Sequence, residues 1–319
     1  MPVLGSPAVS NLDRDPAAVP LSDRAGDRPA FEPLLSRRAP VGESTTVSRY
    51  LPTRARTTVG AWCFVDRYGP DDVATGPGMQ VGPHPHIGLQ TVTWLLEGEV
   101  VHRDSLGSAQ AIRPGQLNLM TAGSGIAHAE VSPPARPPRL HGLQLWVALP
   151  ATDVPPAFAH HADLPVAEMD PGVSARVLVG ELGGARSPAA VHSPLLAAEV
   201  HLGGRTMVPL QSDYEHAVLV VDGAVTIEGR DLPVGSCAYL GRRRSNLVVA
   251  GAPSGTFLLL GGEPFTQSLV MWWNFVGRTA DEIAAARADW ESGRRFGDVA
   301  LGGERVPAPP LPVGRLKPR

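Results

Sequence analysis

The chain has 319 residues, 43% of them hydrophobic, which is long enough for two domains that each bury a core. Its formal net charge is −3, with 28 basic and 31 acidic residues, and this balance excludes the overall basic surface expected of a direct nucleic-acid binder. The 35 glycines and 33 prolines are typical of many short strands joined by turns.

Residues 1–30 mix Pro, Ala, Asp and Arg without periodicity, which predicts a flexible N-terminal tail. They lack the basic segment and the continuous apolar run of a signal peptide, and no later stretch is apolar enough to span a bilayer. The two cysteines, Cys63 and Cys237, lie in apolar runs and are interpreted as buried thiols in a reducing compartment. We therefore expect a cytoplasmic protein that does not bind membranes.

Residues 31–155 contain a first series of strand-like runs, each bounded by Gly, Pro, Asn or Asp. The runs are TTVSRYL, GAWCFVDRYG, TVTWLLEG, EVVHRD, LNLMTAG and LHGLQLWVAL. Short strands at this spacing predict a β-barrel or a sandwich.

Residues 156–265 contain a second series of strands, and the two halves resemble each other. TVTWLLEGEV (91–100) aligns with HAVLVVDGAV (216–225), and RPGQLNLM (113–120) aligns with LPVGSCAYL (232–240) if one residue is inserted. A duplicated barrel is the economical interpretation. The sequence therefore predicts an all-β protein with two barrels in tandem.

Residues 266–319 predict a short C-terminal helix followed by an extended tail. Thr279 and Glu282 have the spacing of a helix capping box. One face of the predicted helix carries three apolar residues, Ile283, Ala286 and Trp290. We expect this face to pack onto one of the barrels.

Two pairs of polar residues have a spacing of two, His84 with His86 and His128 with Glu130. In a strand, residues i and i+2 point to the same face and lie about 6.5 Å apart, so each pair can reach one ion. Three imidazoles and a carboxylate suit a first-row transition metal. Ferrous iron is the leading candidate, and other divalent transition metals stay open.

The remaining histidines are interpreted as ordinary core or surface residues, because a lone histidine in a strand is seldom a metal ligand. They are His102, His141, His160, His161, His192, His201 and His216.

The stretch HPHIGLQTVTWLLEGEVVHRDSLGSAQAIRPGQLNLMTAGSGIAHAEV (84–131) closely resembles the pirin family of bicupins. Further matches are FVDRYGP (64–70), LHGLQLWVALP (140–150) and GEPFTQSLVMWWNFVGRTADEI (262–283). The resemblance implies two cupin barrels in tandem, of which only the N-terminal barrel holds iron. The ligands that it implies are His84, His86, His128 and Glu130.

The alignment of the two halves agrees with a C-terminal barrel without metal. It places Pro209 and Gln211 at the positions of His84 and His86, and a valine, Val248, at the position of the third histidine. No histidine or carboxylate stands at these places in the second half.

The resemblance also implies an activity. Pirins are known as iron-dependent proteins, several of which cleave flavonols such as quercetin with dioxygen. We expect a dioxygenase of the quercetin 2,3-dioxygenase type that takes a small aromatic enediol and O2, with Glu130 as the catalytic group that accepts the hydroxyl proton. Apolar walls would hold the aromatic ring, and the candidates are Met120, Leu143, Leu145 and Trp146, for which a role in the barrel core is equally open.

Two alternatives belong to other functional classes. The first is a metal-dependent, redox-sensing regulator that acts through a protein partner without turnover, since eukaryotic pirins are also described as nuclear transcription co-regulators. The second is another reaction of metal cupins, such as isomerisation or decarboxylation.

The sequence departs from the family at H-P-H-R-G-F-E, where Ile87, Leu89 and Gln90 replace the arginine, phenylalanine and glutamate. We expect Gln90 to occupy the slot where many cupins place a carboxylate ligand, which would make the site less negative. Ile87 would remove a cation near the site. We therefore expect metal binding to be retained, while the substrate and turnover stay open.

Overall fold

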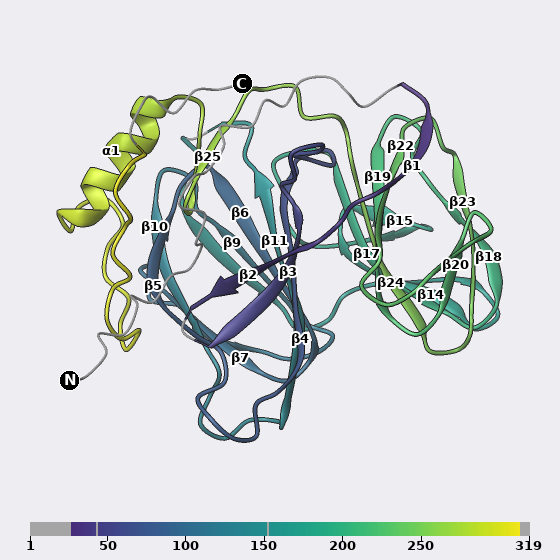
Figure 1. The fold of residues 1–319 in the computed structure, drawn as a ribbon, viewed down its shortest axis with the longest axis horizontal. Helices are drawn as coiled ribbons and strands as arrows, with labels where there is room; N and C mark the ends of the chain where they lie inside the picture. The colour runs from purple at the N-terminus through teal and green to yellow at the C-terminus, as the bar shows by residue number, and fades with distance from the viewer. Residues whose placement is uncertain (1–26, 43, 152, 313–319) are drawn as a thin grey trace.

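The computed structural model describes residues 27–42, 44–151 and 153–312. Figure 1 shows two β-barrels beside each other, with a helix against the outer side of the N-terminal barrel. This confirms the predicted all-β architecture of two barrels and a short C-terminal helix. Residues 1–26, the greater part of the predicted N-terminal tail, lie outside the described residues, as do residues 313–319 of the predicted C-terminal tail.

The N-terminal barrel is built from a seven-stranded sheet and a four-stranded sheet. The larger sheet has the order β12-β9-β6-β11-β4-β3-β2. Its strands in chain order are β2 (Arg37–Val41), β3 (Thr45–Leu51), β4 (Trp62–Asp72), β6 (Leu89–Glu97), β9 (Leu117–Thr121), β11 (Arg139–Ala148) and β12 (Ala157–His161). The smaller sheet has the order β5-β10-β7-β8, with β5 (Gln80–His86), β7 (Val100–Asp104), β8 (Ala109–Ile112) and β10 (Ile126–Val131).

The C-terminal barrel repeats this plan. Its larger sheet has the order β1-β22-β19-β24-β17-β14-β13. The strands are β1 (Pro29–Pro33), β13 (Val166–Asp170), β14 (Val173–Val179), β17 (Leu195–Leu202), β19 (Glu215–Asp222), β22 (Cys237–Gly241) and β24 (Gly255–Gly262). The smaller sheet, β18-β23-β20-β21, consists of β18 (Arg205–Pro209), β20 (Val225–Ile227), β21 (Arg230–Leu232) and β23 (Asn246–Gly251). Two short hairpins complete the sheets, β15 (Glu181–Leu182) with β16 (Ala185–Arg186), and β25 (Val270–Trp272) with β26 (Phe275–Gly277).

The strand orders support the duplication that the sequence predicts. β6 and β19 hold the same place in their sheets, and so do β9 and β22, as the alignment of the two halves requires. The edge place next to β9 is filled by β12, and the corresponding place next to β22 is filled by β1. β1 precedes the N-terminal barrel in the chain but pairs with β22 of the C-terminal barrel, and β12 follows residue 156 but pairs with β9. The domain division at residues 31 and 156 stays a prediction, and these two strands pair across it.

The main strands are buried on both faces, because one face of each larger sheet lines its own barrel and the other face packs on the second barrel. In β6, Val92 and Trp94 belong to a core shared by the two barrels, whereas Leu95 lies in a core within the N-terminal barrel. The Trp62 indole donates a hydrogen bond to the Gly261 carbonyl of the second barrel at 3.0 Å. Burial on both faces stabilises the strands and fixes the two barrels against each other.

The helix α1 (Ala280–Glu291) forms where the capping box predicts it. Thr279 is the N-cap and accepts a hydrogen bond from the Glu282 amide at 3.2 Å. Its buried face consists of Ile283, Ala286 and Trp290, as expected. This face packs with Ile87 and Ala127 of the N-terminal barrel in one apolar cluster. In the part of the chain that the structure describes, no helix is long and apolar enough to cross a membrane.

Candidate metal centre

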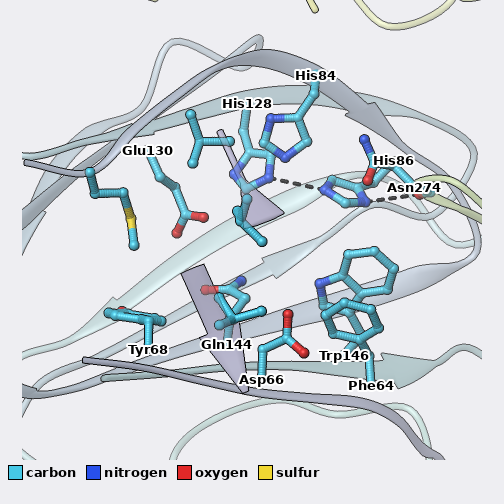
Figure 2. Close-up of a pocket in the computed structure, with 14 residues that line it drawn as sticks. Phe64, Asp66, Tyr68, His84, His86, His128, Glu130, Gln144, Trp146 and Asn274 are labelled. Atoms are coloured by element: carbon cyan, nitrogen blue, oxygen red, sulfur yellow. Dashed lines mark hydrogen bonds between the residues drawn. The ribbon is translucent and has the colours of Figure 1, made fainter. Parts of the chain in front are cut away.

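Three histidines meet inside the N-terminal barrel (Figure 2). His84 and His86 point to one side of β5, and His128 faces His84 across the antiparallel pair of β5 and β10. The three side chains are buried, and their rings lie 4.3 to 5.0 Å apart between centroids. One nitrogen of each ring lies within 4.8 Å of the other two. The structure therefore brings together the three histidines that the spacing singled out.

Hydrogen bonds fix which nitrogen of His84 and His86 faces the others. Nδ1 of His84 lies 2.8 Å from the carbonyl oxygen of Gly82, and Nδ1 of His86 lies 2.9 Å from that of Asn274. A carbonyl oxygen only accepts, so each Nδ1 carries the proton and donates it. In a neutral ring this leaves the lone pair on Nε2.

His128 is fixed by two further residues. Its Nδ1 lies 3.3 Å from Nδ1 of His102, whose Nε2 lies 3.0 Å from the Asp104 carboxylate. In a neutral His102 whose Nε2 proton goes to the carboxylate, Nδ1 of His102 is the acceptor for the Nδ1 proton of His128. The lone pair of His128 is then also on Nε2.

The donor set fits a cation. Nε2 of His86 and Nε2 of His128 lie 3.1 Å apart, and both carry lone pairs in this arrangement. A metal ion satisfies such a pair, and Nε2 with Nδ1 hydrogen-bonded elsewhere is the usual form of a histidine ligand. Burial lowers the pKa of His84 to about 4 and holds the pKa values of the other two well below the ordinary range. The rings are therefore neutral at pH 7 and ready to coordinate.

Glu130 lies on the same strand as His128, but its carboxylate is close to a different set of histidines. It is buried, and Thr93 donates a hydrogen bond to its Oε1 at 3.1 Å. Its carboxylate groups with His128 and His102 within 4.8 Å, and not with all three of the other predicted ligands. A bulge in the pairing of β5 and β10, with His128 opposite His84 but Glu130 opposite Val81, aims the carboxylate. Burial raises the pKa of Glu130.

His102 and Asp104 are the residues that the sequence interpretation missed. His102 was interpreted as an ordinary histidine, yet it joins His128 to Asp104, and its ring stacks on Phe158 of β12 at 4.3 Å. The signal was available, because residues 102 and 104 have the same i, i+2 spacing on a strand as the ligand pairs.

A pocket lies beside the histidines, and His84, His86, His128 and Glu130 all line it. Figure 2 shows Asp66, Phe64 and Trp146 on the wall opposite the histidines. Tyr68, Gln144 and Asn274 also line it. Of the four apolar wall residues predicted from the sequence, only Trp146 lines this pocket. The other three, Met120, Leu143 and Leu145, belong to apolar core clusters.

The three departures from the family motif lie outside the pocket. Gln90 donates to the Thr121 hydroxyl at 2.9 Å and to the Ala190 carbonyl of the second barrel at 3.1 Å. The prediction that Gln90 occupies a ligand slot is therefore wrong, because positions 90 and 93 of one strand point to opposite faces and Thr93 faces Glu130. Ile87 packs under α1, and Leu89 lies in a core cluster with Trp146.

In the C-terminal barrel, aliphatic side chains fill the corresponding strands. Val208 of β18 and Leu247 and Val249 of β23 are buried in its core. The aligned residues Pro209 and Val248 are adjacent to these positions and less buried. The alignment of the two halves is therefore shifted by one residue in these strands.

Comparison with known proteins identifies the family. The chain matches the family model described as Pirin over residues 44–147 and the model of the pirin C-terminal cupin domain over residues 195–297. A Pseudomonas aeruginosa protein named "Putative quercetin 2,3-dioxygenase" is 47% identical over 285 residues, which cover 88% of this chain and 90% of that protein. The chain belongs to the pirin family. The resemblance seen in the sequence is thus confirmed.

Two further pirin-family comparisons agree. A crystal structure titled quercetin 2,3-dioxygenase from Acinetobacter baumannii superposes with a TM-score of 0.85 at 40% identity and covers 92% of this pirin and 100% of that chain. Human pirin is 32% identical over 223 residues, which cover 66% of this chain and 76% of the human protein. The chain is therefore a bicupin of the pirin family whose His/Glu cluster can bind a metal ion.

Proposed function

We propose that this pirin is an iron-dependent dioxygenase that opens flavonols or related enediols with O2. The observation that carries the proposal is the arrangement of His84, His86 and His128, three buried neutral imidazoles with their lone pairs on Nε2 beside a pocket lined by aromatic and polar side chains. The names of the bacterial relatives support this choice of reaction.

His84, His86, His128 and Glu130 would hold the metal. Three neutral nitrogen ligands and one carboxylate suit ferrous iron and leave coordination positions open. When bound, such an ion supplies places for the substrate hydroxyl and for dioxygen and lowers the pKa of the hydroxyl.

Glu130 accepts the proton of the substrate hydroxyl in this proposal. Burial raises the pKa of this carboxyl group, which makes it a better base than an exposed glutamate. The hydrogen bond from Thr93 engages Oε1, so Oε2 would serve the metal and would take the proton by partly releasing it. Asp104 has a different part, since it orients His102 and through it His128.

Phe64 and Trp146 form the apolar wall for an aromatic substrate. Their rings stack with centroids 4.0 Å apart and planes 12° apart, and Trp146 meets the edge of His86 at 5.1 Å. A planar ligand bound at the histidines would therefore lie next to an apolar aromatic surface.

The test is turnover by protein loaded with ferrous iron. Quercetin and a small panel of enediols are added, and oxygen uptake is followed together with loss of the flavonol absorbance. We expect both signals to rise and fall together with metal content. Stoichiometric iron without turnover across the panel would contradict the proposal and favour the regulator that acts through a protein partner.

A further inference from the structure

A row of polar side chains crosses the larger sheet of the N-terminal barrel. Its members are Cα partners on neighbouring strands: Arg49 on β3, Asp66 on β4, Gln144 on β11, Thr93 on β6 and Asn118 on β9. Thr93 connects the row to the metal cage, because its hydroxyl lies 3.0 Å from Gln144 Oε1 and 3.1 Å from Glu130 Oε1.

The C-terminal barrel contains the same row without polar residues. The alignment of the two halves pairs Thr93 with Val218 and Asn118 with Ala238. The complete row there is Val177, Ala198, Leu259, Val218 and Ala238, again Cα partners on neighbouring strands and all buried in one apolar core. The barrel fold therefore does not require polar residues in this row, and their presence in the N-terminal barrel is not explained by folding alone.

Arg49 and Asp66 form a two-point ion pair within the row. Nε of Arg49 donates to Oδ1 of Asp66 at 2.8 Å and Nη2 donates to Oδ2 at 2.7 Å. The two side chains are 1% and 2% exposed, so the pair is shielded from water. The Arg49 guanidinium carbon lies 4.1 Å from the centroid of the Phe64 ring, which in turn stacks on Trp146.

Asp66 keeps the capacity to bind a further donor. A carboxylate has about four lone-pair sites, and Arg49 occupies one on each oxygen. Asp66 lines the pocket, and Figure 2 shows its carboxylate on the wall opposite His84 and His128. A buried ion pair contributes little net stability, because desolvation offsets its attraction. Stability therefore does not explain why this ion pair is present, whereas its position in the pocket suits it to contact a ligand.

We propose that Asp66, held by Arg49, accepts a hydrogen bond from a hydroxyl of the substrate on the side of the pocket opposite the histidines. The inference rests on the function proposed above and narrows its substrate class. The preferred ligand is a flat aromatic with an enediol-like group for the metal and at least one further phenolic hydroxyl on another ring. The Phe64 and Trp146 rings lie on the same wall of the pocket as Asp66 and would support the flat face of such a ligand.

The experiment compares anaerobic binding of matched ligands to the iron-loaded protein by calorimetry. The ligands are 3-hydroxyflavone, its 4′-hydroxy and 7-hydroxy derivatives, and the corresponding methoxy compounds, which cannot donate. The variant is Arg49→Met/Asp66→Leu, in which an apolar pair of similar volume replaces the ion pair, as in the C-terminal barrel. The control is Arg113→Gln/Glu99→Gln, which removes a two-point ion pair outside the pocket.

We expect the wild type and the control to bind at least one hydroxy derivative about tenfold or more tightly than 3-hydroxyflavone and the methoxy compound. The Met/Leu variant should lose this preference and bind 3-hydroxyflavone as the wild type does. A preference that survives in the Met/Leu variant, or a wild type without any preference, overturns the inference. Oxygen uptake is then measured on the same protein preparations in air, which separates the two proposals. If the Met/Leu variant loses the ligand preference but no preparation consumes oxygen, the role of Asp66 is supported and only the dioxygenase is contradicted.

Discussion

Nδ1 of His102 lies 3.3 Å from Nδ1 of His128, and this contact fixes the tautomer of a residue that points into the candidate metal cage. The His102 ring is itself held by the Asp104 carboxylate at 3.0 Å. The cage thus depends on two residues that lie outside the predicted ligand set.

Asp104→Asn should weaken metal binding by about 10- to 100-fold without unfolding the barrel. The Oδ1 of Asp104 accepts from the Leu106 and Ser108 amides, and an asparagine oxygen can do the same. The amide NH2 would then face Nε2 of His102, reverse its tautomer and place the His128 proton on Nε2. Competition with a chelator measures the affinity, and circular dichroism checks the fold. Unchanged affinity would show that His102 does not orient His128.

His84→Ala and His128→Ala should each abolish stoichiometric iron, because each removes one of three convergent nitrogens. His216→Ala is the control, since this buried histidine belongs to the C-terminal barrel. Elemental analysis of the purified variants gives the result. Iron retained in both ligand variants would contradict the assignment of the site.

Glu130→Gln should lower turnover by about 100-fold or more, since general base catalysis commonly contributes this much. The amide oxygen can still accept from Thr93, so the barrel should keep its stability. Rates are normalised to bound metal, which separates loss of the base from loss of the ion. Equal rates per bound iron would exclude Glu130 as the proton acceptor.

Ile87→Arg, which restores the residue of the family motif, should destabilise this chain by about 3 kcal/mol or more. Ile87 is 2% exposed and packs with Phe275 and Trp272 under α1, where a guanidinium would be desolvated. Ile87→Val, which keeps the apolar contact, is the control and should cost about 1 kcal/mol. Urea denaturation measures both. A variant Ile87→Arg as stable as the wild type would mean that the α1 contact opens to admit the charge.

Replacement of His216 by an apolar residue should make the free energy of unfolding depend less on pH below pH 6.5. Burial lowers the pKa of His216 to about 4, and neither ring nitrogen has a hydrogen-bond partner among the described residues. Protonation therefore favours the unfolded chain. Stability due to the neutral ring is fully present above pH 6.5 and declines as the pH falls from there toward 4, by about 3 kcal/mol in all.

The comparison uses metal-free wild type and His216→Leu, with the free energy of unfolding measured by urea between pH 4 and 7. Arg244 and Tyr214, which lie near the ring, are present in both proteins. Parallel curves for the two proteins would show that His216 is protonated without cost in the folded state.

Much of the architecture could be predicted from local patterns. The strand runs, the repeat between residues 91–100 and 216–225, and the Thr279 capping box depend on neighbouring residues in the chain, and the structure contains all three features. The pairing of the edge strands β1 and β12 could not be predicted. Both are short, and each pairs with the edge of a strand that lies far away in the chain.

The sequence by itself determined that His84 shares a strand face with His86 and that His128 shares one with Glu130, because i, i+2 spacing fixes the face on which a side chain lies. The antiparallel pairing of β5 with β10 then brings His128 to the first pair. Only the tertiary structure decided that Gln90 leaves the pocket, that His102 and Asp104 support His128, and that Arg49, Asp66 and Thr93 form one row. Those relationships depend on the register between strands that are far apart in the chain, and register is set by packing and hydrogen bonding across the whole sheet.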